Sequence, residues 1–152
     1  MLKGTDESAL VELPSGDVVL NMRTDHLNAS CDCRAFAVSH DAGASFGPLQ
    51  FDPTLISPVC QASLLRVGDS VYFANPADKK SRVNTTIRRG TGLPGGWQAA
   101  TLLLQPGDAW GGYTSMVGPV DPPAAKQGGV LWEHWPTGGE ATISWATFPL
   151  EF

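Results

Sequence analysis

Short segments of this chain alternate apolar and polar residues, and turn residues stand between them. A period of two is typical of half-buried β-strands, and no segment carries the sustained apolar stripe of period 3.6 that an amphipathic helix requires. Turns such as Pro14–Asp17 and Gly68–Asp69 separate the segments. The pattern therefore predicts an all-β fold of about ten or eleven short strands. The clearest of them are expected within residues 9–13, 18–22, 33–39, 62–67, 70–75, 83–89, 97–104, 113–120, 128–135 and 141–148.

One turn chooses among the all-β architectures. Residues 39–46 fit the pattern Ser-x-Asp-x-Gly-x-Ser/Thr-Phe/Trp, called the Asp-box, which lies between the two outer strands of β-propeller blades. The carboxylate and hydroxyls can bond within the turn, glycine can supply a positive φ, and the aromatic ring is expected to anchor the turn on the blade core. A chance Asp-Gly hairpin is the alternative. The predicted members are Ser39, Asp41, Gly43, Ser45 and Phe46.

Length and composition fit part of a propeller. The chain has 152 residues, of which 42% are hydrophobic and 16% charged, so it can bury a core. A blade takes about 40–45 residues in well-known propellers. The expectation is one domain, 1–152, with about three to four blades of a larger propeller whose N-terminal blades are absent.

Charge and hydropathy exclude some functions. The net charge is −5 and no basic residues cluster, which argues against a nucleic-acid partner. No stretch of 18 apolar residues occurs, so no transmembrane segment is predicted. The compartment stays open: secreted, lysosomal and membrane-associated locations all fit the sequence.

The cysteines and histidines predict no metal site. Cys31 and Cys33 are separated by one residue, which is too close for the usual zinc knuckle, and Cys60 stands alone. The three histidines have no metal-ligand spacing. Free thiols and a single disulfide both remain open for the cysteines.

Six segments carry polar groups in a recognisable order. Glu7 lies in Thr-Asp-Glu-Ser-Ala-Leu, Arg23 in Leu-Asn-Met-Arg, Arg82 in Ser-Arg-Val-Asn-Thr-Thr, and Tyr113 in Gly-Gly-Tyr-Thr-Ser-Met. Between them, Val-Cys-Gln-Ala-Ser around Gln61 is similar to a Cys-Gln-Gly-Ser strand, and Val-Leu-Trp-Glu, which ends at Glu133, is similar to Leu-Tyr-Glu. In this order, and together with the Asp-box, they resemble the C-terminal part of the exo-α-sialidase (neuraminidase) family.

The resemblance implies a partial six-bladed β-propeller that hydrolyses terminal α-linked sialic acid from glycoconjugates with retention. It implies sialylated glycans as partners and no cofactor. Tyr113 would be the nucleophile and Glu7 the base that accepts its proton. Arg23 and Arg82 would bind the substrate carboxylate, and Glu133 would orient a further arginine. Gln61 would contact the glycan, although a structural buried amide is an equal alternative.

The chemistry of sialic acid explains these residue types. Its anomeric carbon carries a carboxylate, and a second carboxylate at about 4 Å would cost roughly 4 kcal/mol at an effective dielectric of 20. A phenol avoids this repulsion, and sialidases are the tyrosine-dependent exception among glycosidases. Because an unperturbed tyrosine has a pKa near 10, it needs a base beside it.

Two members of the family site have no counterpart here. The first arginine and the acid/base aspartate come from the family's N-terminal blades, and no segment before Glu7 matches them. We therefore expect the chain alone to be a poor sialidase that self-associates. A non-catalytic sialic-acid-binding or structural Asp-box segment is one alternative function, and transfer of sialic acid to another sugar is a second.

Overall fold

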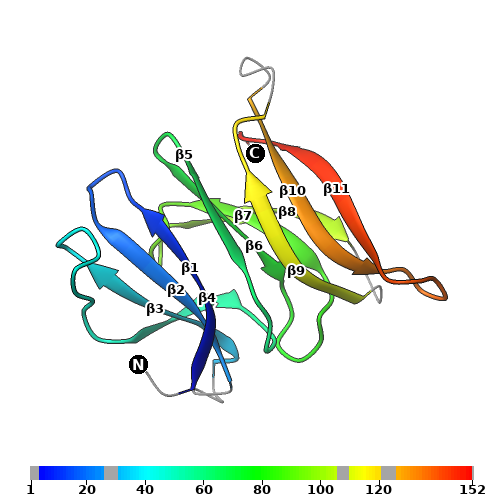
Figure 1. Ribbon diagram of the computed structural model, residues 1–152, viewed down its shortest axis with the longest axis horizontal. Coiled ribbons are helices and arrows are strands. Elements are labelled where there is room, and N and C mark those ends of the chain that lie inside the picture. The colour runs from blue at the N-terminus through cyan, green and yellow to red at the C-terminus, as the bar shows by residue number, and fades with distance from the viewer. Residues whose placement is uncertain (1–3, 26–30, 106–109, 121–125, 152) are drawn as a thin grey trace.

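The computed structural model describes residues 4–25, 31–105, 110–120 and 126–151. Within these ranges the chain forms β-strands joined by turns and contains no helix, so none that could cross a membrane (Figure 1). The strands are β1 (Thr5–Glu12), β2 (Val18–Thr24), β3 (Cys33–Ser39), β4 (Gln50–Ile56), β5 (Ser63–Val67), β6 (Ser70–Pro76), β7 (Thr85–Gly90), β8 (Trp97–Gln105), β9 (Trp110–Val117), β10 (Gln127–Trp135) and β11 (Thr142–Pro149).

The strands form three antiparallel sheets that follow one another along the chain. Sheet A has the order β1-β2-β3-β4, sheet B the order β5-β6-β7-β8, and sheet C the order β11-β10-β9. The first strand of sheet B, β5, lies between the first strands of the other two sheets, β1 and β9, which is the arrangement of propeller blades around an axis (Figure 1). The prediction of an all-β partial propeller is confirmed, with the described sheets at the lower end of the expected three to four blades.

Strand β1 shows how the sequence pattern produces this packing. Its side chains alternate between exposed and partly or fully buried positions, as a half-buried strand requires. The buried set ends in Val11, which packs with Phe36 of the same sheet and Val71 of sheet B. The cores therefore lie between the sheets, and each sheet depends on its neighbour to cover its face.

A second core joins sheets B and C. Tyr72 and Ile87 of sheet B pack against Val130 and Phe148 of sheet C, and the rings of Tyr72 and Phe148 are 5.7 Å apart. The Tyr72 hydroxyl donates a hydrogen bond to the carbonyl of Leu150. Fully burying an apolar side chain of this size contributes about 1.5–3 kcal/mol, so this cluster is a major source of stability.

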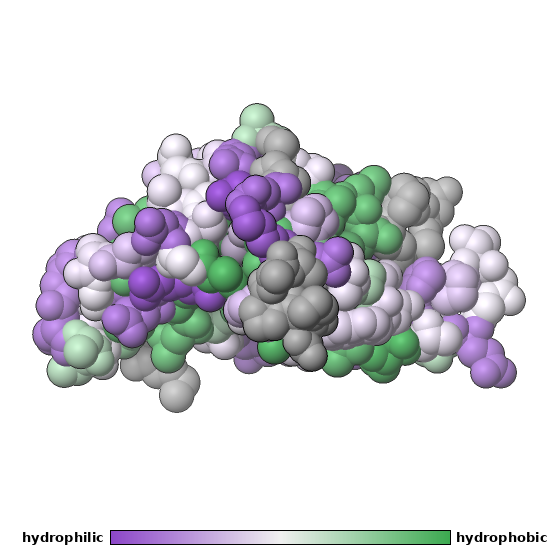
Figure 2. Space-filling view, turned by 90° about the horizontal axis from the view of Figure 1, so that it is seen from above, coloured by the Kyte–Doolittle hydropathy of each residue, from purple (hydrophilic) through white to green (hydrophobic). Residues whose placement is uncertain are grey.

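The outer face of sheet C is apolar and uncovered. Its large exposed side chains are those of Val117, Leu131, Ile143 and Trp145, with Ile143 66% accessible. Figure 2 shows hydrophobic surface on the right of the molecule, the side on which sheet C lies in Figure 1. Contiguous apolar patches of this kind normally pack against another surface.

The Asp-box turn has the predicted position and hydrogen bonds. It joins β3 to β4, the two outer strands of sheet A. Asp41 accepts bonds from the Ser39 hydroxyl (2.6 Å) and from both the amide (2.8 Å) and the hydroxyl (2.5 Å) of Ser45. Gly43 has a φ of 88° and donates its amide to the Ser39 hydroxyl, at 2.8 Å.

The ring of Phe46, which the sequence predicted to anchor the turn, is 38% exposed. Its anchoring role stays a prediction. The turn ends with the amide of Gly47 bonded to the carbonyl of Val38.

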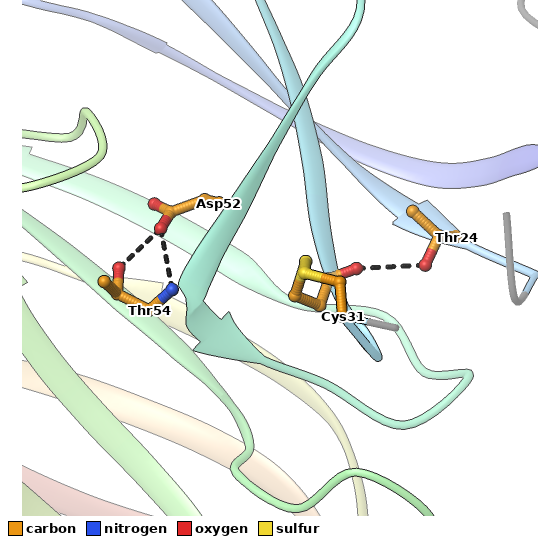
Figure 3. The surroundings of a disulfide bond; sticks show 5 residues. Thr24, Cys31, Asp52 and Thr54 are labelled. Carbon is orange, nitrogen blue, oxygen red and sulfur yellow. Dashed lines mark hydrogen bonds between the residues drawn. A yellow bond between two sulfur atoms is a disulfide. The ribbon is translucent and has the colours of Figure 1, made fainter. Parts of the chain in front are cut away.

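Sheets A and B are also joined by a buried carboxylate. Asp52 of β4 is 2% exposed and accepts a 2.8 Å bond from the indole nitrogen of Trp97 at the start of β8. Its other oxygen accepts from the amide and hydroxyl of Thr54 (Figure 3). The bond fixes the outer strand of sheet B against sheet A.

The cysteines, which the sequence left open, divide into a disulfide and a thiol. Cys31 and Cys33 form a disulfide where β3 begins, with Cα atoms 5.1 Å apart (Figure 3). The Thr24 hydroxyl donates to the carbonyl of Cys33 at 3.0 Å, which fastens this end of β3 to β2. Cys60 is a buried free thiol.

Asp41→Asn should destabilise the chain in a pH-dependent way. The hydrogen bonds from Ser39 and then from Ser45 lower the pKa of Asp41 to about 2, from an ordinary value of 3.8. A lowered folded-state pKa adds stability above the unfolded pKa, and this is lost as pH falls through the folded value. We therefore expect a lower thermal midpoint for Asp41→Asn at pH 7. The difference from wild type should shrink between about pH 4 and pH 2.

Thermal unfolding followed by circular dichroism across that range measures the effect. Asp69→Asn, in the exposed turn between β5 and β6, is the matched control and should leave the midpoint unchanged. A midpoint difference for Asp41→Asn that stays constant from pH 7 to pH 2 would contradict this account.

Candidate active site

Glu7 and Tyr113, the predicted base and nucleophile, both lie at irregularities in inner strands. The pairing of β1 with β2 shifts between Thr5 and Ser8, so that β1 has one extra residue there. The pairing of β9 with β10 also shifts: Thr114 pairs with Trp132, and Gly111 pairs with His134. Strand β9 therefore has one extra residue there. A β-bulge redirects a side chain that regular alternation would place elsewhere.

The two bulges bring these side chains into contact. The Tyr113 hydroxyl donates a hydrogen bond to one oxygen of the Glu7 carboxylate. The other oxygen of Glu7 accepts a 2.6 Å bond from Arg23 of β2. One carboxylate therefore joins a phenol of sheet C to a guanidinium of sheet A.

Arg23 is held as a cation by its surroundings. Its side chain is only 15% exposed, and burial acts to lower its pKa. The hydrogen bond and negative charge of Glu7 outweigh burial, with help from Asp25, whose carboxylate lies 3.3 Å from Nε. The net result is a raised pKa, so the guanidinium stays charged at any physiological pH.

Arg82 reaches the same place from the loop between β6 and β7. One Nη donates to the carbonyl of Val59 at 3.0 Å. The guanidinium carbon lies 5.2 Å from the ring centre of Trp110 and 5.8 Å from that of Tyr113, which are cation–π distances. The ring of Trp110 in turn packs edge-to-face against that of Trp135, with the two ring centres 4.2 Å apart.

Sequence reasoning missed Trp110 and Trp135 as part of this site. Trp110 opens β9 and stands three residues before Tyr113, so it lies just outside the Gly-Gly-Tyr-Thr-Ser-Met motif. The amide of Gly111 also donates to the carbonyl of Arg82, at 2.6 Å. The start of β9 thus holds both the backbone and the side chain of Arg82.

Glu133 lies behind Tyr113. One carboxylate oxygen accepts a 3.0 Å bond from the amide of Tyr113, which uses the donor that the bulge in β9 frees. A side chain at Gly112 would meet the end of this carboxylate, so Glu133 would have to move away from the Tyr113 amide to admit it. The structure thus places the carboxylate of Glu133 against the backbone of Tyr113, and its predicted role in orienting a further arginine stays a prediction.

The side chain of Gln61 is hydrogen-bonded to the backbone of Thr114, the residue after Tyr113. Its amide nitrogen donates to the carbonyl of Thr114 at 3.0 Å, and its oxygen accepts from the amide of Thr114 at 2.9 Å. The Thr114 hydroxyl is bonded to Ser63 and to the carbonyl of Ala74. Gln61 therefore fixes β9 against sheet B, and its predicted contact with a glycan stays a prediction.

A cavity of about 340 Å³ opens beside these residues. Its walls come from β9, β10 and β11 together with Gln61. The wall residues include Tyr113, Glu133 and the apolar side chains of Leu131, Trp132 and Ile143. Within the described ranges, no three His, Cys, Asp or Glu side chains gather where they could share a metal ion.

The chain is similar in sequence to curated sialidases. The chain is 34% identical over 114 residues to a sialidase of Micromonospora viridifaciens and 35% identical over 119 residues to a sialidase of Bacteroides fragilis. These matches cover 68% and 70% of this chain. The solved structure of the Hadza microbial sialidase Hz136 superimposes with a TM-score of 0.68 over 95% of this chain, at 25% identity. No family model matches.

The relatives are much longer than this chain. It spans 17% and 21% of the two sialidases that match in sequence, and 28% of Hz136. The likeness therefore concerns a segment of each relative.

Gln61→Ala should destabilise the chain by about 2 kcal/mol, because it removes two hydrogen bonds worth about 1 kcal/mol each. Urea unfolding measures the change, and a lower midpoint with an unchanged slope is expected. Gln127→Ala, which alters an exposed side chain at the start of β10, is the matched control and should change little. Equal stability of the two variants would show that the Gln61–Thr114 pair does not hold β9.

Proposed function

This chain belongs to the sialidase family and matches a segment of its longer members, and we propose that it supplies the part of an exo-sialidase active site that carries the nucleophile. Tyr113 would attack sialic acid, Glu7 would accept the tyrosine proton, and Arg23 and Arg82 would bind the substrate carboxylate. The observation that carries the proposal is the hydrogen bond from the Tyr113 hydroxyl to a carboxylate that a partly buried arginine also holds.

The proposed first step is a nucleophilic displacement at the anomeric carbon. The Tyr113 oxygen forms a bond to that carbon while its proton moves to the bonded oxygen of Glu7. The bond from the anomeric carbon to the leaving oxygen breaks, and the leaving group takes a proton from an acid or departs as an anion. Water then attacks the anomeric carbon and loses a proton to a base of the complete site or to solvent. The bond from that carbon to the Tyr113 oxygen breaks, and Glu7 returns its proton to this oxygen. Two displacements at the same carbon retain its configuration.

The two arginines suit a substrate that carries a carboxylate on the reacting carbon. Arg23 and Arg82 approach Glu7 and Tyr113 from sheets A and B respectively. A guanidinium matches the planar carboxylate in a way that lysine cannot.

The site proposed here is one part of the family's arrangement. We have assigned no residue of this chain to the remaining arginine or to the acid that protonates the leaving oxygen. General acid catalysis typically contributes about 10²–10⁴-fold. Activity of this chain should therefore depend strongly on the leaving group.

Tyr113→Phe should abolish covalent capture of an activated sialoside. A sialosyl fluoride needs no acid for departure, and a second fluorine on the adjacent carbon slows hydrolysis of the intermediate. Incubating the 152-residue chain with this reagent should add one sialosyl group, which tandem mass spectrometry should locate on Tyr113. Tyr113→Phe should gain no such mass, and Glu7→Gln should react more slowly by about 10²-fold or more.

Tyr72 provides an internal control, since it is the other tyrosine of the chain and is buried. Label on Tyr72, or equal labelling of wild type and Tyr113→Phe, would refute the assignment of the nucleophile. An unlabelled wild type that still binds free sialic acid would instead favour the binding function. Product analysis with a sugar acceptor separates transfer from hydrolysis.

Arg82→Ala should weaken binding of free sialic acid by about 10- to 100-fold, since a hydrogen bond to a charged group contributes about 1.5–3 kcal/mol. Trp110→Leu should weaken it by only a few-fold, because it removes a cation–π contact of about 0.5–1 kcal/mol from Arg82. Isothermal titration calorimetry measures both. Arg88→Ala, on β7, is the control and should bind as wild type does. Unchanged affinity in Arg82→Ala would remove this residue from the site.

A further inference from the structure

A buried arginine lies apart from the groups assigned so far. Arg34 of β3 has no exposed surface, although its sequence, Cys-Arg-Ala-Phe-Ala-Val-Ser, marks it as the one charged residue of an apolar strand. The pKa of Arg34 is lowered to about 9, mainly by burial, so the group still carries its charge at neutral pH. A buried charge is costly unless its contacts compensate it.

The contacts of Arg34 are to neutral groups. Nε donates to the side-chain oxygen of Asn21 and Nη1 to the carbonyl of Cys60, both at 2.8 Å. The ring of Phe73 lies 5.9 Å away. Nη2 is buried and has no hydrogen-bond partner among the described residues. No carboxylate in the described part of the chain forms a salt bridge with Arg34, although the negative charge of Glu7 acts on it from a distance. The guanidinium is therefore a poor source of stability, and its presence calls for another role.

Arg34 holds the carbonyl of Cys60, and the residues on either side of Cys60 are also held by hydrogen bonds. The carbonyl of Val59, just before it, accepts the bond from Arg82. The side chain of Gln61, just after it, is clamped to Thr114, which follows Tyr113. Val59, Cys60 and Gln61 are thus tied to Arg82, Arg34 and β9 in turn.

We propose that Arg34 is a positioning residue, which fixes the Val59–Gln61 segment through the Cys60 carbonyl and thereby sets the places of Arg82 and Tyr113. The expected effect of Arg34 on activity rests on the proposed function. Its expected effect on the positions of Arg82 and Tyr113 does not depend on that function. A displacement of about 1 Å in a reacting group can cost about 10²-fold in rate.

The test uses tyrosine NMR on the 152-residue chain. Ring-labelled tyrosine gives two signals, since the chain has two tyrosines, and Tyr72→Phe assigns them. Arg34→Met keeps an unbranched apolar side chain in place of the arginine stem and removes the donors and the charge. We expect it to move the Tyr113 signal while the Tyr72 signal, from the core between sheets B and C, stays in place. The rate of covalent labelling at Tyr113 should fall by about 10- to 100-fold.

Arg34→Lys restores the charge and one donor group but cannot serve Asn21 and Cys60 together as the planar fork does. It should fold, give a Tyr113 signal between those of wild type and Arg34→Met, and recover part of the labelling rate. Arg88→Met is the control and should match wild type in both measurements. If Arg34→Met does not fold, the Tyr113 signal of Arg34→Lys decides, and a shift is again expected.

Two results would overturn the inference. One is a Tyr113 signal and labelling rate in the folded Arg34 variants that match wild type. The other is a shift of the Tyr72 signal as large as that of Tyr113, which would mean general loosening of the chain. If the wild-type chain is never labelled, the proposed function fails, but the NMR comparison still decides whether Arg34 positions Tyr113.

Discussion

The carboxylate of Glu7 is shared by two sheets that are not neighbours. Arg23 holds it from sheet A and Tyr113 from sheet C, while sheet B lies between them (Figure 1). The hydrogen bond from Tyr113 can form only when both sheets are packed correctly against sheet B. The apolar clusters between the sheets are therefore a condition of the site's geometry as well as a source of stability. A substitution that leaves a cavity in either cluster would shift Tyr113 relative to Glu7, because close-packed interiors transmit small displacements.

The strands and the Asp-box could be predicted from the sequence because both depend on local patterns. Alternation identified the strands, and the side-chain bonds of Asp41 lie within a few residues of it. The sequence could not decide the state of the cysteines or the exposure of Phe46. Both depend on how the ends of β3 and β4 lie, which no local pattern encodes.

The candidate site was predictable only as an order of motifs. The positions of Glu7, Arg23, Arg82 and Tyr113 along the chain carry no sign that their side chains meet, and the two bulges that help them to do so appear only in the strand pairing. Trp110 and Arg34 were missed for a related reason. A tryptophan at a strand end and an arginine within a strand are usually surface groups. Their contacts with Arg82 and Cys60 come from segments distant in sequence.

The bulges at Glu7 and Tyr113 also bear on how this chain can change in evolution. Successive side chains of a strand point to opposite faces, so loss of one residue turns every later side chain to the other face until the pairing recovers. In β1 and β9 the extra residue lies beside the group that would react. A single-codon deletion in either strand could leave every functional residue type intact and still separate Tyr113 from Glu7. Homologous chains that keep all of these residues but differ by one codon in β1 or β9 would then be candidates for pseudoenzymes.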